Sequence, residues 1–283
     1  MKAGIIGLGQ IGGGIALWLA QEGVLAGVYD LRRDAAQGLE GLPSMAASPA
    51  EVARQSDVVI IAVLNASQTI DVLDGPEGVL AGARPGLSVV LVATVAMEDL
   101  ARIRMITDAA GVPLVDCGVA GGPAVRQRRL VSLVGATDAE FERVRGVLAG
   151  FSESVLHMGG PGSGMAAKIA MNTVITGTLR AGFEGAALAR AAGIDIRRLA
   201  QAIDETATGR GPMMVMCRPN VSTSDAGEAA TREGMRNIFV KDLDAALELG
   251  RALNVALPLA VLARNTSHEV FGVAAKRDEL GAS

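Results

Sequence analysis

The chain is poor in aromatic residues and in cysteine. Aromatic side chains make up 2% of its 283 residues, whereas hydrophobic residues make up 50%, so its core must be built from aliphatic side chains and alanine. The two cysteines, Cys117 and Cys217, are a hundred positions apart. Such usage excludes a disulfide-rich scaffold and lacks the close spacing of a zinc site. We therefore expect free thiols, no bound metal and a reducing compartment.

Long apolar runs and clusters of positive charge are also missing. No stretch of about 18 uncharged apolar residues occurs, and even the apolar segment after Gly164 carries Lys168 and Arg180. The formal net charge is -4 and the basic residues are scattered, unlike a nucleic-acid-binding surface. The start, MKAGIIG, has no signal-peptide pattern. We expect a cytoplasmic protein with neither a membrane nor a nucleic-acid partner.

Short apolar runs alternate with amphipathic segments over the first part of the chain. The runs at 3–6, 24–29, 58–63, 88–92, 114–116 and 130–134 have the length and composition of buried strands. Between two of them, Ser48, Pro49 and Glu51 have the spacing of a helix start. Strands and helices in alternation predict an α/β fold with a doubly wound parallel sheet.

The pattern changes at the glycine-rich segment 159–162, after which apolar residues recur at helical spacing to the end. We therefore predict an α/β domain over 1–160 and an all-α domain over 161–283, joined by one long helix at 164–192. Further helices are expected at 197–205, 235–253 and 258–273. A helical domain this small and apolar is expected to complete its core against a second copy, in a homodimer or homotetramer.

A glycine-rich turn follows the first predicted strand and opens a helix. It consists of Gly7, Leu8, Gly9, Gln10, Ile11 and Gly12. Glycines at this spacing allow a tight turn, approach of a pyrophosphate to the helix N-terminus, and close helix packing. With Asp30 after the next strand, the order predicts a dinucleotide site. Asp30 favours NAD through the ribose 2'-hydroxyl, while Arg32 and Arg33 leave NADP open as the alternative.

Lys168 is one of only four lysines in a chain that has 22 arginines. It lies in a segment that is otherwise made of small and apolar residues, and a desolvated lysine can release its proton whereas arginine cannot. Asn172 follows at i+4, on the same helical face. Lys168 is therefore either an acid–base group or a side chain whose ammonium reaches solvent. Upstream, residues 116–122 supply consecutive small residues whose backbone N–H groups suit a carboxylate.

Taken together, these motifs resemble the β-hydroxyacid dehydrogenase family, which includes 3-hydroxyisobutyrate dehydrogenase, tartronate semialdehyde reductase and 6-phosphogluconate dehydrogenase. The resemblance covers almost the whole chain and rests on GLGQIG from 7, VLN from 63, AT at 93–94, GVAGG from 118, GSGMAAKIAMN from 162 and KDL from 241. It implies a Rossmann domain followed by a helical domain. It also implies NAD(P)-dependent hydride transfer to or from a small anionic β-hydroxy acid or semialdehyde.

The resemblance implies roles for single residues. Lys168 matches the catalytic general acid–base, and Asn172 matches a substrate-binding asparagine. The carboxylate loop corresponds to Ala120, Gly121 and Gly122. Positions near the nicotinamide or facing the cofactor correspond to Leu64, Asn65, Thr94 and Lys241. Next to Lys241, Asp242 is expected to be a buried ion-pair or capping partner.

Several positions depart from the family pattern. Gly118 stands for a usual proline, Ala120 for a usual serine and Trp18 for a usual asparagine, and the loop that follows is PAVRQRR. Because a hydroxyl donor is lost where cations are gained, we expect Arg126 to bind an anionic group of the substrate. The alternative is that the loop arginines are simply solvated.

Two other functions stay open at this stage. Imine reductases share the fold, but they generally carry another residue in place of the lysine. A cofactor-binding scaffold without catalysis is the second alternative. The presence of both Lys168 and Asn172 disfavours each of them.

Overall fold

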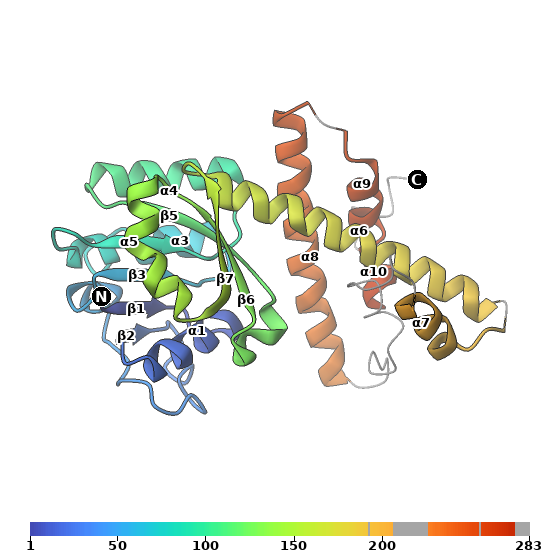
Figure 1. Ribbon diagram of the computed structural model, residues 1–283, viewed down its shortest axis with the longest axis horizontal. Coiled ribbons are helices and arrows are strands. Elements are labelled where there is room, and N and C mark those ends of the chain that lie inside the picture. Colours follow the sequence, from blue (N-terminus) through green and yellow to red (C-terminus); the bar gives the residue numbers. More distant parts are fainter. Residues whose placement is uncertain (192, 206–225, 255, 275–283) are drawn as a thin grey trace. The chain divides into compact units, whose positions relative to one another are not determined.

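The computed structural model describes residues 1–283 except 192, 206–225, 255 and 275–283 (Figure 1), so Cys217 lies outside the described residues. The chain forms two compact units, Met1–Lys168 and Ile169–Ser283. The predicted boundary after residue 160 stays a prediction. Because the division falls inside helix α6 (Ser163–Ala191), the first turns of that helix belong to the first unit together with Lys168.

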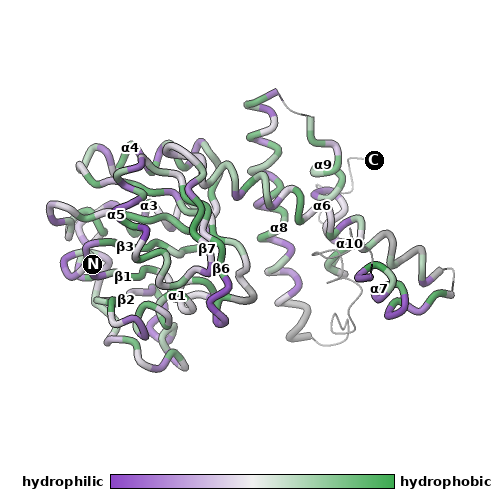
Figure 2. Tube along the Cα trace, viewed as in Figure 1, coloured by the Kyte–Doolittle hydropathy of each residue, from purple (hydrophilic) through white to green (hydrophobic). Residues whose placement is uncertain are grey.

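The first unit is built on one seven-stranded sheet with the order β2-β1-β3-β4-β5-β6-β7. Its strands are β1 (Ala3–Ile6), β2 (Leu25–Tyr29), β3 (Val58–Ile61), β4 (Ser88–Leu91), β5 (Leu114–Ala120), β6 (Leu130–Gly135) and β7 (Ser152–Gly159). The central strands are hydrophobic along their length (Figure 2), and β1, β3 and β4 are buried throughout. Such continuous burial is typical of a sheet that is covered on both faces.

The predicted doubly wound parallel sheet is confirmed, with one pair of neighbouring strands as an exception. β5 and β6 are antiparallel, while the other neighbours in the described sheet are parallel. The physical reason is the connection 121–129, which is too short for the crossover that parallel neighbours need. The sequence pattern also gives no separate strand for β7, because only its first residue is buried and it therefore lacks a continuous apolar run.

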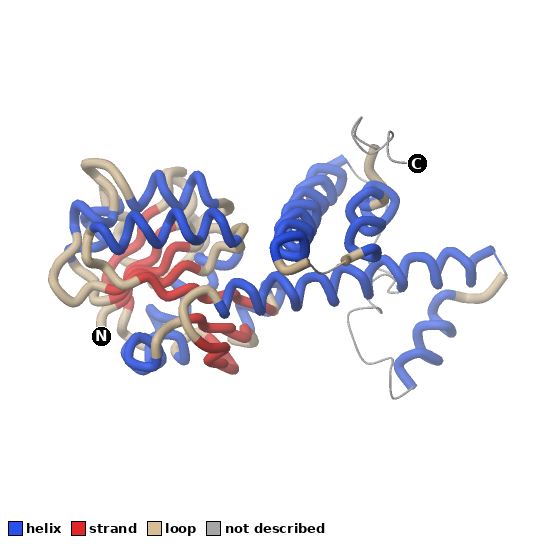
Figure 3. The backbone as a smooth tube through the Cα atoms, turned by 90° about the horizontal axis from the view of Figure 1, so that it is seen from above, coloured by secondary structure: helices blue, strands red, loops and turns tan. Residues whose placement is uncertain are grey.

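Helices cover both faces of the sheet (Figure 3), as expected of a doubly wound fold. They are α1 (Gln10–Gln21), α2 (Pro49–Arg54), α3 (Ala66–Leu73), α4 (Met97–Ala109) and α5 (Asp138–Ala149), with short 3-10 turns η1 (Val79–Gly82) and η2 (Gly122–Gln127). The predicted start of α2 is confirmed, because the Glu51 N–H donates to the Ser48 hydroxyl at 3.3 Å. Leu19 of α1 and Leu148 of α5 pack into one core with Phe151.

The described part of the second unit is helical. Besides the rest of α6 it contains α7 (Ile196–Glu205), α8 (Ala226–Ala252), α9 (Pro258–Asn265) and α10 (Ser267–Phe271). The long helix is confirmed with 29 residues, whereas the single helix expected at 258–273 is interrupted at Thr266. Phe239, Leu243 and Ala263 form a core. Among the described helices, none combines the length and apolar character needed to cross a membrane.

Candidate active site

The strand order places the predicted cofactor residues at one edge of the sheet. β1 lies between β2 and β3, so the winding of the chain reverses there, and ligands of doubly wound sheets bind at such a point beyond the carboxyl ends of the strands. The residues that follow these strand ends include Gly7, Asp30, Asn65, Thr94 and Gly121. Residues more than a hundred positions apart in the sequence are thus brought to the same edge.

The three glycines of the turn have distinct surroundings. Gly7 has φ +91°, and a Cβ there would lie 2.6 Å from the Ala62 carbonyl oxygen. A Cβ at Gly12 would overlap the Gly7 carbonyl oxygen, so only glycine lets α1 approach the strand this closely. At Gly9, by contrast, a Cβ would meet no described atom within 4 Å. The turn therefore has the two tight positions and the one open position that a pyrophosphate-binding loop requires.

The N-terminus of α1 is open to an anion. Gly9 is its N-cap residue, and no side chain in the described part of the chain caps the helix. Gln10 and Ile11 form the first turn, whose backbone N–H groups have no partner within the helix. These groups and the helix dipole attract phosphate, so the turn fits a dinucleotide cofactor.

Asp30 fixes the glycine-rich turn from the end of β2. One carboxylate oxygen accepts the Leu8 N–H at 2.7 Å, and the other accepts the Arg32 N–H at 2.8 Å. The Arg32 guanidinium also lies 3.4 Å from that second oxygen. Burial raises the pKa of Asp30, but these hydrogen bonds and the Arg32 charge outweigh it, so the pKa lies below its usual value. Asp30 therefore stays ionised.

Asn65 begins helix α3 beyond the end of β3. Its side-chain oxygen accepts the Gln68 N–H at 2.9 Å, while the Gln68 side chain accepts the Leu64 N–H at 3.0 Å. Leu64 is 57% exposed. The asparagine and glutamine spacing is a capping signal that can be recognised in a sequence. Thr94 follows β4 and is half-buried. These residues frame the same strand edge as the glycine-rich turn.

Part of the predicted carboxylate loop belongs to the sheet instead. β5 continues through Gly118 to Ala120, which pair with Leu133 and Val131 of β6, so the expectation of an open loop from residue 116 is wrong. The backbone of residues 118–120 is paired with β6. The sequence pattern alone does not reveal this pairing. Gly121 and Gly122 are the first residues beyond the strand. Gly121 has φ +89°, a left-handed conformation that favours glycine.

The three arginines after this turn differ in their contacts. The Arg128 guanidinium pairs with Glu22 at 2.7 Å, and Arg129 lies 3.7 Å from Glu153. Arg126 is exposed and makes no hydrogen bond or ion pair with any residue that the structure describes. Of the three, Arg126 is thus the cation that remains available to a ligand.

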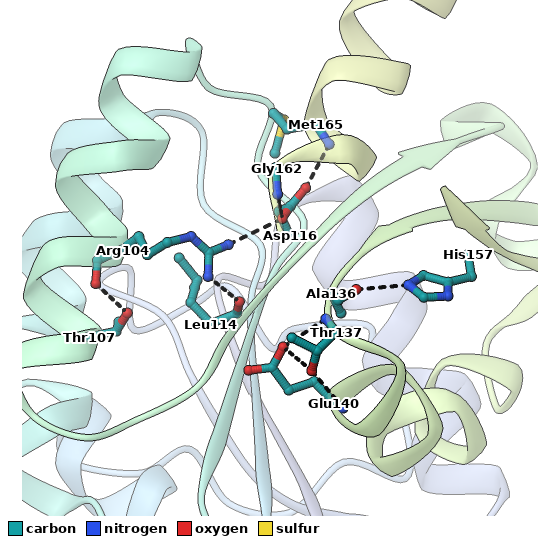
Figure 4. Close-up of polar contacts among 10 residues, drawn as sticks. All are labelled: Arg104, Thr107, Leu114, Asp116, Ala136, Thr137, Glu140, His157, Gly162 and Met165. Atoms are coloured by element: carbon teal, nitrogen blue, oxygen red, sulfur yellow. Dashed lines mark hydrogen bonds and ion pairs between the residues drawn. The ribbon is translucent and has the colours of Figure 1, made fainter. Parts of the chain in front are cut away.

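Asp116 anchors the start of α6 on β5 (Figure 4). This buried carboxylate accepts the N–H groups of Gly162 and Met165 at 2.6 and 2.8 Å, and the Arg104 guanidinium lies 3.3 Å away. Burial raises the pKa of Asp116 more than these partners lower it. The sequence does not reveal this anchoring role of Asp116, although an acidic residue within a buried strand is itself a signal.

Lys168 packs against β5 through its aliphatic stem. A Cβ at Gly118 would overlap the Lys168 Cβ and lie 2.9 Å from its Cγ, and one at Gly164 would lie 2.5 Å from the Leu133 carbonyl oxygen. Glycine therefore brings the helix backbone close to the strands. Gly118, a departure from the family pattern, provides the space that the Lys168 stem occupies. This places Lys168 beside the strand that leads into Gly121 and Gly122.

Within the second unit, Asn172 and Lys241 meet at Asp242. The Asn172 amide nitrogen donates to one Asp242 oxygen at 2.7 Å, and the Lys241 ammonium lies 3.2 Å from the other. The expected ion-pair role of Asp242 is confirmed, and its bond to Asn172 is a contact that the sequence does not reveal. Because Asp242 engages the amide nitrogen, the Asn172 amide oxygen is left to accept hydrogen bonds. Asn172 lies one turn after Lys168 on α6.

Two family models match the chain. Residues 2–160 match the NAD-binding domain of 6-phosphogluconate dehydrogenase. Residues 162–280 match the NAD-binding domain of NADP-dependent 3-hydroxyisobutyrate dehydrogenase. Together they span both units.

Individual relatives are similar along nearly the whole chain. L-threonate dehydrogenase of Escherichia coli is 30% identical over 266 residues, covering 93% of this chain and 86% of the relative. 3-Hydroxyisobutyrate dehydrogenase of Pseudomonas aeruginosa is 30% identical over 270 residues, covering 92% of this chain and 89% of the relative. The crystal structure of 3-hydroxyisobutyrate dehydrogenase from Salmonella typhimurium superimposes with a TM-score of 0.80 at 27% identity. The match covers 99% of this chain and 98% of that structure's chain. The chain therefore belongs to the β-hydroxyacid dehydrogenase family of NAD(P)-dependent oxidoreductases.

Proposed function

We propose that the protein oxidises a small β-hydroxy acid, or reduces the matching semialdehyde, with Lys168 as the general acid–base. The observation that carries this proposal is the position of Lys168, whose stem packs on Gly118 just before the Gly121–Gly122 turn. The bound nicotinamide supplies the hydride acceptor or donor. In the oxidation direction, the Lys168 amine would take the hydroxyl proton as the hydride leaves the carbinol carbon. Reduction returns that proton to the carbonyl oxygen.

We propose that four further residues hold the substrate. Gly121 and Gly122 offer backbone N–H groups to the carboxylate, beyond the end of β5. Asn172 offers its amide oxygen to the substrate hydroxyl, since Asp242 engages its amide nitrogen. Lys241 is held by the same carboxylate, and by the family resemblance it would contribute positive charge to the cofactor and the substrate. Ala120 provides no hydroxyl, so the acid group depends on backbone donors and cations.

We further propose that the substrate carries a second anionic group, which Arg126 binds. Arg126 is the loop arginine that no described residue pairs with. A guanidinium recognises a carboxylate with two parallel hydrogen bonds. For the cofactor we propose NAD over NADP, because an ionised Asp30 repels a 2'-phosphate and engages Arg32.

A panel of substrates with both cofactors tests the proposed reaction. It includes 3-hydroxyisobutyrate, L-threonate, hydroxy diacids, the matching semialdehydes and cyclic imines, and it follows NADH or NADPH absorbance. Turnover of a hydroxy acid or semialdehyde, strongly reduced in Lys168→Ala, is the expected result. Faster turnover of imines identifies an imine reductase instead. Cofactor binding without any turnover identifies a scaffold.

We also infer a homodimer or homotetramer in the cytoplasm. Val174, Ile238 and Leu259 of the second unit are each about half exposed or more, which suits a surface that a second copy covers. Light scattering of the purified chain tests the oligomer, since a monomer at micromolar concentration contradicts it. Cell fractionation tests the location.

A further inference from the structure

The connection between β5 and β6, residues 121–129, is fastened to helix α1. The indole N–H of Trp18 donates to the Val125 carbonyl oxygen at 2.7 Å. Val125 is buried, and its side chain fills the space that a Cβ at Gly14 would occupy. The absence of a side chain at Gly14 thus lets Val125 pack directly against α1, and the Trp18 hydrogen bond holds the Val125 backbone there.

Arg128 fastens the other end of the connection to the same helix. Its guanidinium carbon lies 5.7 Å from the centre of the Trp18 ring, within the range of a cation–π contact. It also pairs with Glu22, just after α1, at 2.7 Å and donates to the Ala149 carbonyl oxygen at 3.0 Å. Its backbone has φ +55°, which is unfavourable for a residue with a side chain. These contacts therefore hold Arg128 in a conformation that it would not adopt freely.

The helix and the connection serve different ligands in the proposed function. The N-terminus of α1 carries the open turn at Gly9 for the cofactor, whereas the connection carries Gly121, Gly122 and Arg126 for the substrate acid. A loop that is ordered beforehand loses less conformational entropy when it binds a ligand. Fastening it to α1 therefore favours binding of the acid without adding any direct contact to it.

We propose that Trp18 is a positioning residue that, together with Arg128, clamps residues 121–129 onto α1 and holds the substrate-binding turn ready for the acid. The clamp itself rests on contacts within the first unit. Its effect on the substrate rests on the proposed function, which assigns the acid group to this turn. Trp18 contacts neither reacting atoms nor cofactor in this scheme, so its effect belongs in KM rather than kcat.

Two variants loosen the clamp from different sides. Trp18→Phe keeps an aromatic ring beneath Arg128 but removes the N–H donor to Val125. Gly14→Ala introduces a Cβ that displaces the Val125 side chain. The matched control is Glu153→Gln, which breaks the Arg129 ion pair at the same connection without touching α1. Titration of NADH checks that each variant still binds the cofactor.

Brief digestion with trypsin measures how firmly the connection is held against α1, without any assay of activity. Arg126, Arg128 and Arg129 are cleavage sites within the connection, and fragments are assigned by mass spectrometry on the NADH-bound full chain. Cleavage at Arg126 should rise about fivefold in Trp18→Phe, which loses the hydrogen bond to Val125, and in Gly14→Ala, which displaces the Val125 side chain. Cleavage outside the connection, and cleavage at Arg126 in Glu153→Gln, should stay at the wild-type rate. Unchanged cleavage at Arg126 overturns the clamp.

Steady-state kinetics with 3-hydroxyisobutyrate, or with the best acid of the panel, tests the positioning role. In both variants KM for the acid should rise roughly three- to tenfold, with kcat and NADH affinity near wild type. Faster cleavage with an unchanged KM overturns the positioning role. If the wild-type enzyme turns over no hydroxy acid or semialdehyde, the proposed function fails instead, while the cleavage result still decides the clamp.

Discussion

Among single residues, Asp30 has the most direct influence on cofactor choice. Both its oxygens are engaged within the chain, and its pKa lies below the usual value. It therefore remains negatively charged at neutral pH and disfavours a 2'-phosphate. We predict that NADH binds at least about tenfold more tightly than NADPH, which corresponds to about 1.4 kcal/mol.

Calorimetric titration with both cofactors checks this preference. Asp30→Asn should reduce the difference in affinity between NADH and NADPH. Asp34→Asn, which alters an exposed acid four residues later, should leave that difference unchanged. Tighter binding of NADPH to the wild-type protein would be the opposite of the expected result.

Arg126 is the residue that we expect to select the substrate. Because it is exposed and not paired with any described residue, its removal should leave the fold intact. We predict that Arg126→Ala raises KM for a hydroxy diacid at least about tenfold, or about 1.4 kcal/mol, and changes KM for the matching monoacid far less. Arg129→Ala is the control. Equal changes for diacid and monoacid would show that Arg126 has no part in selection.

At the scale of elements, the start of α6 depends on the buried carboxylate of Asp116. Its pKa is raised in the folded protein, so the folded state binds this proton more tightly than the unfolded state does. The resulting contribution to stability is fully present below the unfolded pKa of about 3.8 and is lost as pH rises through the folded pKa.

We therefore predict that wild type gains stability relative to Asp116→Asn as the pH is lowered through this window. Denaturant unfolding at pH 7 and at about pH 4.5 measures the difference, with Asp108→Asn on the exposed end of α4 as the control. If the difference in unfolding free energy between wild type and Asp116→Asn shrinks on acidification, hydrogen bonds to the charged carboxylate lower its pKa more than burial raises it.

The contact between α6 and β5 has an equally specific test. A side chain at position 118 would displace the Lys168 stem, so Gly118→Ala should lower kcat about tenfold or more with little change in NADH affinity. Gly146→Ala is the control, since no described atom lies within 4 Å of its added methyl group. Wild-type kcat in Gly118→Ala would show that the close packing does not set the lysine position.

At the scale of the whole molecule, much of the fold can be predicted from sequence because local patterns dominate it. Continuous apolar runs predict β1, β3 and β4, and the glycine spacing predicts the turn before α1. β7 and the reversal at β6 escape prediction, because they depend on sheet-edge exposure and on the length of one connection. Local patterns thus give most of the elements but not every strand or pairing.

The candidate site divides in the same way. Lys168, Asn172 and the glycine-rich turn can be read from spacing and from the family resemblance. The roles of Asp116 and Trp18 and the hydrogen bond between Asp242 and Asn172 cannot, because each depends on a partner 46 to 107 positions away in the sequence. Contacts of this kind become visible only when the strands and helices are placed in three dimensions.

The acid–base role of Lys168 is the central claim, and kcat of Lys168→Ala on the best substrate tests it most directly. We predict a fall of roughly 10² to 10⁴, the usual share of a positioned acid–base group, with NADH affinity unchanged and partial rescue by added methylamine. Lys168→Arg should be nearly as slow, because a guanidinium does not deprotonate. A Lys168→Ala enzyme that keeps more than about a third of wild-type kcat would contradict the claim.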